Sequence, residues 1–179
     1  AKWSADIDTD IGLPIATWDD PYDRSTGSTS AAKAAWCAKP NLLVVSGINP
    51  SFDSDQVPGA AFRYGVDSKK KDLYFTGDLT GLDVSTLGQT IADYEPGVKG
   101  DRFIGQVGTT ADTAPTAKNV QTLGNIRGLA PEEPTKEGSY YASSVAYYAK
   151  INDLRSDLQS KQTADTFAVA LSSPLPKIE

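Results

Sequence analysis

The sequence predicts an α/β fold in which a parallel sheet carries helices and long loops. The first observation is at residues 166–171, where Phe167 to Leu171 are apolar without alternation, as in a strand covered on both faces. The second is a helical segment just before it, over 139–151. A helix followed by such a strand is half of a βαβ unit, so a parallel partner strand must lie elsewhere. The third observation is the apolar run NLLVVS at 41–46, which we expect to be that partner.

The helix predicted over 139–151 is amphipathic. Its inward face is predicted from residues that recur at intervals of three and four, with two small residues beside them: Tyr141, Val145, Tyr148 and Ala149, flanked by Ala142 and Ala146. Tyr140 and Tyr147 lie on the other side and are candidate contact residues, because Tyr is enriched at interfaces. Burial by another part of the same domain is the alternative. The polar residues 152–162 predict a surface connection to the strand.

The first half of the chain begins with turn-rich sequence and then predicts one helix. Ser28 or Ser30 can cap a helix that ends before Pro40, with Trp36 as its core anchor. Residues 47–62 combine Gly, Asn-Pro and Pro-Gly features, which predict a long ordered loop after the strand at 41–46.

The middle of the chain predicts several short elements. Residues 72–76, DLYFT, predict a short strand, and Asp83 or Ser85 can cap a helix over the run VSTLGQTIADYE. The remaining predictions, in order, are a helical face of Leu87, Ile91 and Tyr94, a strand at 102–107, no regular element at 109–118, and a short helix within 119–129 with Val120, Leu123 and Ile126 inward.

Composition bounds both the domain organisation and the function. The chain has 179 residues and a formal net charge of −6, which fits one domain with an acidic, loop-rich lead-in at 1–30 and an α/β core at 31–179. The acidic balance argues against nucleic acid and anionic membranes, since both require Lys and Arg patches. No run of about 18 apolar residues is present, so we expect no membrane span. Because the sequence contains no Met, we expect a processed product or a fragment.

The residue types available for catalysis predict a protein that is not an enzyme. There is no His, which removes the commonest general base and every Ser-His or Cys-His nucleophile. The single cysteine, Cys37, cannot form an internal disulfide, and we expect it to be a small buried residue, with pairing to a cysteine outside the chain as the alternative. A hydrolase using paired carboxylates, Glu132 with Glu133 or Asp53 with Asp55, is the enzymatic alternative. Adjacent carboxylates on a loop are rarely held at catalytic separation.

Two acidic clusters are candidate cation sites. Asp6, Asp8 and Asp10 alternate, which places three carboxylates on one side of an extended loop and suits a hard cation such as Ca²⁺. Asp53 and Asp55 follow the strand at 41–46, and ligands in parallel sheets sit at the carboxyl ends of strands. In both cases a solvated or capping carboxylate is the alternative.

Three blocks carry a family likeness. They are WCAKPNLLVVSGINPSFDSDQVPG at 36–59, GDLTGLDVSTLGQTIADYE at 77–95 and the whole run from 131 to 179. Together they resemble the von Willebrand factor A-like region of PilY-type proteins, the type IV pilus tip-associated adhesins related to neisserial PilC. The first 30 residues match only loosely. The resemblance implies an extracellular, non-enzymatic protein of the pilus that takes part in pilus assembly, adhesion, surface sensing and twitching motility.

The chain departs from that family at the positions that would bind a cation. The resemblance implies an Asp-x-Ser-x-Ser motif after a first strand, and the nearest match, Asp23-x-Ser25-x-Gly27, sits in a turn. Gly47 stands after the central strand, where an Asp is expected. The family's best-known calcium site lies in a propeller outside this segment, so calcium dependence is not implied here. We therefore expect a partial or variant von Willebrand A-like, Rossmann-like sheet with long loops.

These observations support two hypotheses from different classes. The first is a non-enzymatic extracellular interaction module of a pilus-associated protein, with pilin or minor pilin-like subunits, or a host or abiotic surface, as partners. The second is a structural filament or surface-layer subunit that assembles with copies of itself, which the low charge density and the abundant Thr, Ser and Ala would allow.

Overall fold

Two small sheets and two helices make up the described part of the chain. The computed structural model describes residues 20–22, 35–47, 57–62, 81–128 and 138–171, without the side chains of 111–115. In chain order the elements are β1 (Asn41–Gly47), α2 (Val84–Tyr94), β2 (Gly100–Val107), β3 (Thr110–Val120), β4 (Ile126–Arg127), α3 (Tyr141–Ile151) and β5 (Asp165–Leu171). The predicted α/β class is confirmed, as a mixed fold with small sheets.

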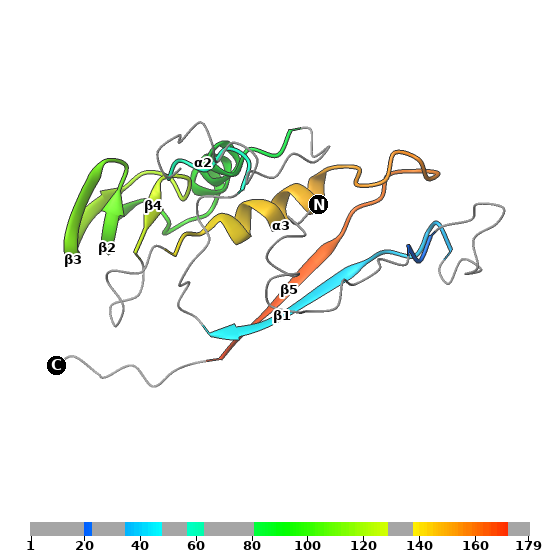
Figure 1. Cartoon of the computed structure of the whole chain (residues 1–179), viewed down its shortest axis with the longest axis horizontal. Helices are drawn as coiled ribbons and strands as arrows, with labels where there is room; N and C mark the ends of the chain where they lie inside the picture. The colour runs from blue at the N-terminus through cyan, green and yellow to red at the C-terminus, as the bar shows by residue number, and fades with distance from the viewer. Residues whose placement is uncertain (1–19, 23–34, 48–56, 63–80, 129–137, 172–179) are drawn as a thin grey trace, which may run out of the picture.

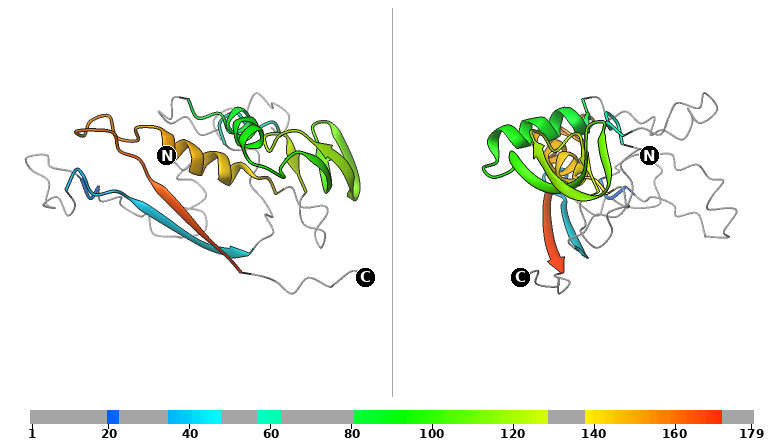
Figure 2. Two further views of the ribbon diagram at one scale, coloured as in Figure 1. Left: turned by 180° about the vertical axis from the view of Figure 1, so that it is seen from behind. Right: turned by 90° about the vertical axis from the view of Figure 1, so that its left-hand side faces the viewer.

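The elements form two regions (Figure 1). β3, β2 and β4 make a three-stranded antiparallel sheet, which lies beside α2 and α3. We call these elements, together with residues 57–62, the helix–sheet body. β1 and β5 make a separate two-stranded parallel sheet, which we call the ribbon. Both views in Figure 2 show the ribbon projecting from the body.

Two clusters of buried side chains hold the body together. The larger joins both helices to residues 57–62 and contains Ala60, Phe62, Leu82, Val84, Tyr141 and Tyr148. The smaller lies on the antiparallel sheet and contains Ile104, Val120 and Ile126. A polar contact crosses the first cluster, since the buried Oγ of Ser144 donates to the carbonyl oxygen of Val84 at 2.8 Å. The core of the described chain therefore belongs to the body.

The first helix begins as predicted and packs through glycine. Asp83 caps α2, because its Oδ1 accepts a hydrogen bond from the amide of Thr86 at 2.8 Å. Gly88 faces Gly124, and a Cβ atom on Gly88 would lie 2.8 Å from the Gly124 nitrogen. A Cβ on Gly124 would collide with the carbonyl of Ser85. Only glycine at both positions permits this backbone contact.

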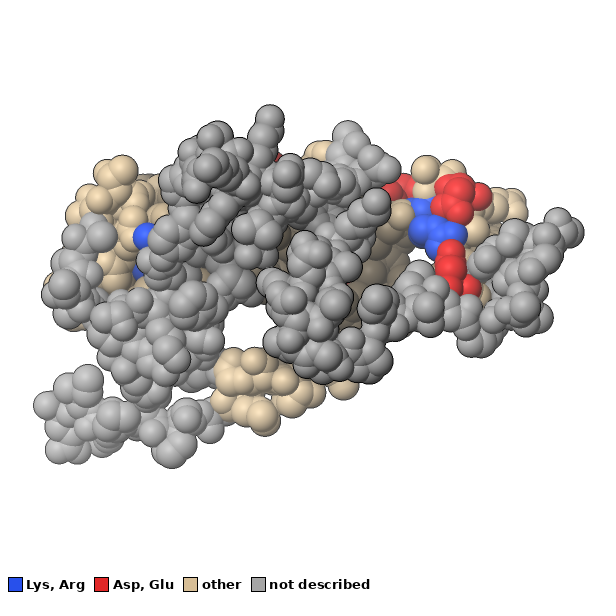
Figure 3. Space-filling model, in the orientation of Figure 1, with Lys and Arg blue, Asp and Glu red and all other residues tan. Residues whose placement is uncertain are grey.

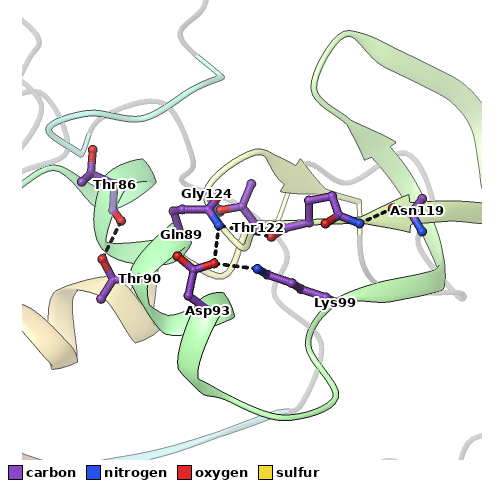
Figure 4. Close-up of polar contacts among 9 residues, drawn as sticks. Thr86, Gln89, Thr90, Asp93, Lys99, Asn119, Thr122 and Gly124 are labelled. Carbon is purple, nitrogen blue, oxygen red and sulfur yellow. Dashed lines mark hydrogen bonds and ion pairs between the residues drawn. The ribbon is translucent and has the colours of Figure 1, made fainter.

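Exposed polar side chains tie the end of α2 to the antiparallel sheet (Figure 4). Asp93 Oδ1 accepts from Gln89 Nε2 at 2.8 Å and pairs with Lys99 Nζ at 2.6 Å. Lys99 and then Gln89 lower the pKa of the Asp93 carboxyl. At the strand ends, Asn119 Nδ2 donates to Asp101 Oδ1 at 2.9 Å. Contacts this exposed stabilise little individually and serve mainly to orient the helix end.

The predicted inward faces of the two helices need correction. The buried positions of α2 are Val84, Gly88 and Ala92, so the predicted face of Leu87, Ile91 and Tyr94 is wrong at Tyr94, which is 83% exposed. In α3 the inward positions are Tyr141, Ser144 and Tyr148, and Val145 is exposed. In both cases a small residue lies inward because the neighbouring backbone comes close to the helix.

The hairpin of β2 and β3 was predicted only in its first half. β2 confirms the strand predicted at 102–107, but the prediction of no regular element at 109–118 is wrong, since β3 runs through it. The chain reverses at Gly108, which has φ 56° and lies between the paired residues Val107 and Thr110. A two-residue turn with glycine first is a common hairpin connection. Together with the Thr content of β3, this turn is the signal that could have found the strand.

The short helix predicted within 119–129 is also wrong. β3 continues to Val120, a turn follows, and β4 pairs with β2. The predicted inward side chains are nevertheless correct, because Val120 and Ile126 are buried and Leu123 packs against them. Pairing with β2 and the close contact of Gly124 with α2 override the weak helical pattern.

The segment before β1 differs from its prediction. Residues 35–38 form a turn, in which the Ala38 amide donates to the Ala35 carbonyl at 2.8 Å. Trp36 is exposed, so its predicted role as core anchor is wrong, and Cys37 is an exposed free thiol and not a buried residue. Both residues lie next to the ribbon, where the described chain supplies little cover. The start of the predicted helix at 28–34, most of the lead-in at 1–30 and the strand predicted at 72–76 lie outside the described residues.

Candidate interaction surface

The ribbon confirms the predicted parallel pairing of the two apolar segments. Its register runs from Asn41 opposite Asp165 to Gly47 opposite Leu171. Because side chains alternate along a strand, the paired residues divide between two faces. One face carries Leu43, Val45, Phe167, Val169 and Leu171, and we call it the large face. The other carries Leu42, Val44, Ser46, Thr166, Ala168 and Ala170, and we call it the small face.

Both faces are open to solvent. On the large face Leu43 is 68% and Phe167 is 57% exposed, and on the small face Leu42 is 49% exposed. In Figure 3 the visible part of the ribbon is tan, without Lys, Arg, Asp or Glu. The prediction that the strand at 166–171 is covered on both faces is therefore wrong for the described chain. The sequence has the composition of an interior strand, but the described chain places no layer on either side of it.

Open faces of this kind are unusual for parallel strands. Parallel sheets are found almost only where both faces are covered, and an isolated two-stranded sheet is marginally stable in water. Fully burying a Leu, Val or Phe side chain contributes about 1.5–3 kcal/mol. The ribbon exposes seven such side chains: Leu42, Leu43, Val44, Val45, Phe167, Val169 and Leu171. Burying these side chains against another surface would therefore stabilise the ribbon, and the described chain does not bury them.

An ion-pair cluster fixes the end of the ribbon nearest the body. Asp165, the first residue of β5, pairs with Lys39 at 2.7 Å and also with Lys150 on α3. The two lysines, Lys150 first, lower the pKa of the Asp165 carboxyl, and Asp165 in turn raises the pKa of Lys150. The Asp165 amide also donates to the Pro40 carbonyl at 3.2 Å. This cluster joins both strands to α3.

The sequence offers a limited signal for that cluster. Lys39 and Asp165 lie more than a hundred residues apart, and only the predicted pairing of β1 with β5 places them near one another. Lys150 belongs to a separate helix, and no local pattern connects it to the other two residues.

A second charged group orders the connection between α3 and β5. Arg155 forms a bidentate contact with Asp157, at 2.8 Å from both Nε and Nη2, and pairs with Asp20 at 2.8 Å. Its guanidinium lies 5.8 Å from the centre of the Tyr22 ring. Asp157 and then Asp20 raise the pKa of Arg155, and Arg155 lowers the pKa of both carboxyls. The group holds residues 20–22 against this connection.

A pocket of about 210 Å³ lies between the turn before β1 and the connection before β5. Its lining includes Trp36, Cys37, Lys39, Lys161 and Gln162. Cys37 is exposed there, and as the single cysteine of the chain it has no internal partner. We assign the pocket no catalytic chemistry.

The two predicted contact tyrosines lie at different points along α3, Tyr140 at its N-cap and Tyr147 in its second half. Tyr140 precedes the helix and is 42% exposed, and partial burial raises the pKa of its hydroxyl. Its carbonyl accepts hydrogen bonds from the amide and Oγ of Ser143. Tyr147 is half-buried within the helix. Both tyrosines retain some accessible surface, and their role as contact residues stays a prediction.

The predicted cation sites and carboxylate pairs lie outside the described residues. These are Asp6, Asp8, Asp10, Asp53 and Asp55, together with Glu132 and Glu133. Among the residues that the structure does describe, no group of three or more His, Cys, Asp or Glu side chains is placed to hold a metal ion. The Ca²⁺ hypothesis therefore stays a prediction.

Comparison with known families adds the decisive observation. Residues 2–149 match the family model described as the PilY1 homolog, second domain. The chain belongs to this PilY1-homolog family. It is also 37% identical, over 179 residues and 98% of its length, to a protein of Xylella fastidiosa (strain Temecula1 / ATCC 700964) named type IV pilus biogenesis factor PilY1 homolog. The predicted relationship to PilY-type proteins is confirmed.

The match covers only a small part of this relative. The chain spans 11% of the length of that relative. No solved structure matches the chain. Within the described ranges no helix combines the length and apolar character that crossing a bilayer requires.

Proposed function

We propose that the chain is a non-enzymatic interaction module of a type IV pilus-associated protein outside the cell, acting in pilus assembly and adhesion. The observation that carries this proposal is the ribbon, whose two faces are apolar, uncharged beyond Asp165 and exposed. Large exposed apolar surfaces mark protein–protein contacts. Membership of the PilY1-homolog family supports the choice of pilus components as the partners in those contacts.

The finer features of the proposal follow from the resemblance to tip-associated adhesins. We take the chain as part of a variant von Willebrand A-like region, with pilin or minor pilin-like subunits as partners and a host or abiotic surface as the adhesion target. Tyr140 and Tyr147 are the proposed contact residues on α3, since both keep accessible aromatic surface. Ca²⁺ at Asp53 and Asp55, or at the three aspartates of the lead-in, remains part of the proposal.

The test is co-purification with pili and pilus-dependent movement in the source organism. We expect the protein in the sheared pilus fraction, and we expect a variant carrying both Tyr140→Ala and Tyr147→Ala to reduce surface pili or adhesion. Tyr94→Ala, at an exposed tyrosine of α2, is the matched control and should leave both unchanged. A protein found only in the cytoplasm would overturn the proposal.

A self-assembling filament or surface-layer subunit is the second candidate function. The observation that favours it is the pair of unpartnered outer edges of the ribbon within the described chain, because open edges can pair with another copy. Light scattering of the purified chain decides between the two. A mass that stays monomeric across concentrations excludes self-assembly.

A further inference from the structure

The two strands of the ribbon separate at the end where both begin. The first paired residues are Asn41 and Asp165, and the Asp165 amide donates to the Pro40 carbonyl at this end. Pro40 has no amide hydrogen, so it cannot extend the ladder, and residues 35–38 form a turn instead. The chain before β1 and the chain before β5 therefore diverge, and the pocket of about 210 Å³ lies between them.

The lining of this pocket is positively charged, although the chain as a whole is acidic. Lys39 and Lys161 contribute to the lining and no Asp or Glu does, whereas the net charge of the chain is −6. Clefts lined by one sign of charge raise the local concentration of ligands of the opposite sign. The pocket therefore favours an anionic ligand.

Two neighbouring carboxylates do not cancel this charge. Asp165 pairs with both Lys39 and Lys150, so the three groups together carry one net positive charge. Asp153 accepts hydrogen bonds from two backbone amides of the connection before β5. Both carboxylates are thus satisfied by the protein itself, and the charge of Lys161 stays available to a ligand.

Several hydrogen-bond donors around the pocket have no partner. In the described part of the chain, the Lys161 ammonium, the Trp36 indole N–H and the Thr163 hydroxyl make no hydrogen bond or ion pair. Ammonium and indole groups can only donate. A ligand that satisfies them must supply acceptor atoms, and the indole ring offers apolar surface to the rest of that ligand.

The connection before β5 holds its side of the pocket in place. Gln162 lines the pocket and is 8% exposed, and its Nε2 donates to the Gln159 carbonyl at 2.9 Å. Its amide donates to Asp153 Oδ1 at 3.0 Å, and its carbonyl accepts from the Leu154 amide at 2.8 Å. A ligand would therefore not have to order this wall, which lowers the entropic cost of binding.

We propose that this pocket binds a carboxylate on an extended peptide of the partner protein. Lys161 and Lys39 contact the carboxylate, and Trp36 packs against the adjoining part of the peptide. The carboxylate is either the C-terminus of that peptide or an Asp or Glu side chain. The inference rests on the proposed function in taking the partner to be a protein, and it names the chemistry of a second contact site beside the ribbon.

A peptide carboxylate fits the pocket better than other ligands. Inorganic phosphate has no apolar part to pack on Trp36, and a neutral sugar does not use the two lysines. The volume of about 210 Å³ is below the roughly 300–1,000 Å³ of pockets for larger small molecules, and it suits one or two peptide residues. The rest of an extended peptide could continue along the ribbon, whose apolar strands begin at the same end.

The chain carries its own reporter for the experiment. Cys37 lines the pocket and is the single cysteine of the chain, so the rate of labelling by a maleimide reports on this position alone. The probes are acetyl-Ala-Ala-Phe with a free C-terminal carboxylate, the C-terminal amide of the same peptide, and acetyl-Ala-Asp-Ala amide. We expect at least one carboxylate peptide to slow the labelling severalfold and the neutral amide to have no effect. The peptide that protects identifies the source of the carboxylate.

A charge variant locates the contact. Lys161→Gln should raise the peptide concentration needed for half-maximal protection about tenfold, because a charge-assisted hydrogen bond is lost. The matched control is Lys99→Gln, at an exposed lysine of the helix–sheet body, which should leave that concentration unchanged. Equal labelling rates without peptide in the three proteins show that the substitutions leave the pocket intact.

Four results would overturn the inference. Equal slowing by the neutral amide would mean that the pocket selects apolar groups, and equal slowing by inorganic phosphate would mean a general anion site. No slowing at millimolar peptide, or slowing that Lys161→Gln does not weaken, would mean that the carboxylate does not bind there. Faster labelling without peptide after Asp6→Asn, Asp8→Asn and Asp10→Asn together would mean that the lead-in of the same chain occupies the pocket.

Pilus co-purification is scored separately from labelling. A chain that binds the carboxylate peptide but is absent from pili would overturn the proposed function alone. A pilus-associated chain whose Cys37 is not protected by either carboxylate peptide would overturn this inference alone.

Discussion

The helix–sheet body and the ribbon contain strands of similar length that are treated in opposite ways. In β2, Ile104 is 2% exposed, whereas the preceding residue Phe103, on the other face of the strand, is 78% exposed. In β5 the side chains of both faces are exposed, including Phe167. β2 is covered on the side that Ile104 faces, whereas β5, which is apolar on both faces, is covered on neither within the described chain. The apolar pattern of a strand thus indicates how many of its faces should be buried, and not whether the described chain buries them.

The largest expected effect separates the two regions directly. Ile104→Ala should lower the free energy of unfolding by about 3 kcal/mol, because it leaves a cavity in the buried sheet cluster. Leu43→Ala in the ribbon should change it by less than about 0.5 kcal/mol, because that side chain is exposed. Urea unfolding of residues 1–179, followed by circular dichroism, measures both. Equal losses would mean that the ribbon is buried in the isolated chain.

Glycine substitutions sharpen the comparison at the backbone. Gly124→Ala should destabilise the chain by about 2 kcal/mol, since the added methyl group collides with the Ser85 carbonyl and α2 must move. Gly47→Ala is the matched control in the ribbon, where an added Cβ meets nothing within 4 Å, and it should cost less than about 0.5 kcal/mol. Thermal unfolding midpoints compare the two. A large loss for Gly47→Ala would contradict the open ribbon.

A smaller effect tests whether the two regions open independently. Asp83→Ala removes the cap of α2 and should cost about 1 kcal/mol, whereas Asp83→Asn keeps an acceptor and should retain most of the stability. Hydrogen exchange should become faster in α2 and stay unchanged in β1 and β5, because the uncovered ribbon opens locally. Faster exchange in both regions would show that they unfold as one unit.

The smallest expected effect is the pH dependence at the end of the ribbon. Lys150 and Lys39 lower the pKa of Asp165 in the folded chain, so its contribution to stability is present above the unfolded-state pKa and is lost as pH falls through the lowered folded value. Asp165→Asn should therefore accelerate exchange of the first β5 amides at neutral pH but not at strongly acidic pH. Asp93→Asn, at the Lys99 pair, is the control and should leave β5 unchanged.

The sequence could predict the elements that have local signals. Asp83 predicts the start of α2, and two uninterrupted apolar runs predict a parallel pair of strands. The elements that the sequence predicts correctly are α2, α3, β1, β2 and β5. β3 could not be predicted from periodicity, because its Thr-rich sequence does not alternate. The helix expected within 119–129 failed because strand pairing and the contact between Gly88 and Gly124 are tertiary effects.

For the interaction surface, the sequence predicts the two apolar strands but not their exposure. The residues 41–46 and 166–171 were predicted as interior strands, and their chemistry fits that prediction. Their exposure could not be predicted, because it depends on what surrounds them and not on what they are. The ion pairs of Asp165 likewise depend on partners distant in sequence, Lys39 and Lys150.

The parallel pairing of the ribbon also determines how this segment would respond to tension. The chain enters the ladder at Asn41 and leaves it at Leu171, at opposite ends of the two strands. A pull along the backbone from both sides therefore loads all the paired residues together in shear, whereas a hairpin pulled at its open end loses its pairs one after another. The helix–sheet body lies between the two strands in sequence, so it carries no load while the ladder holds. In a filament-associated protein the ribbon would therefore keep such a pulling force from unfolding the body.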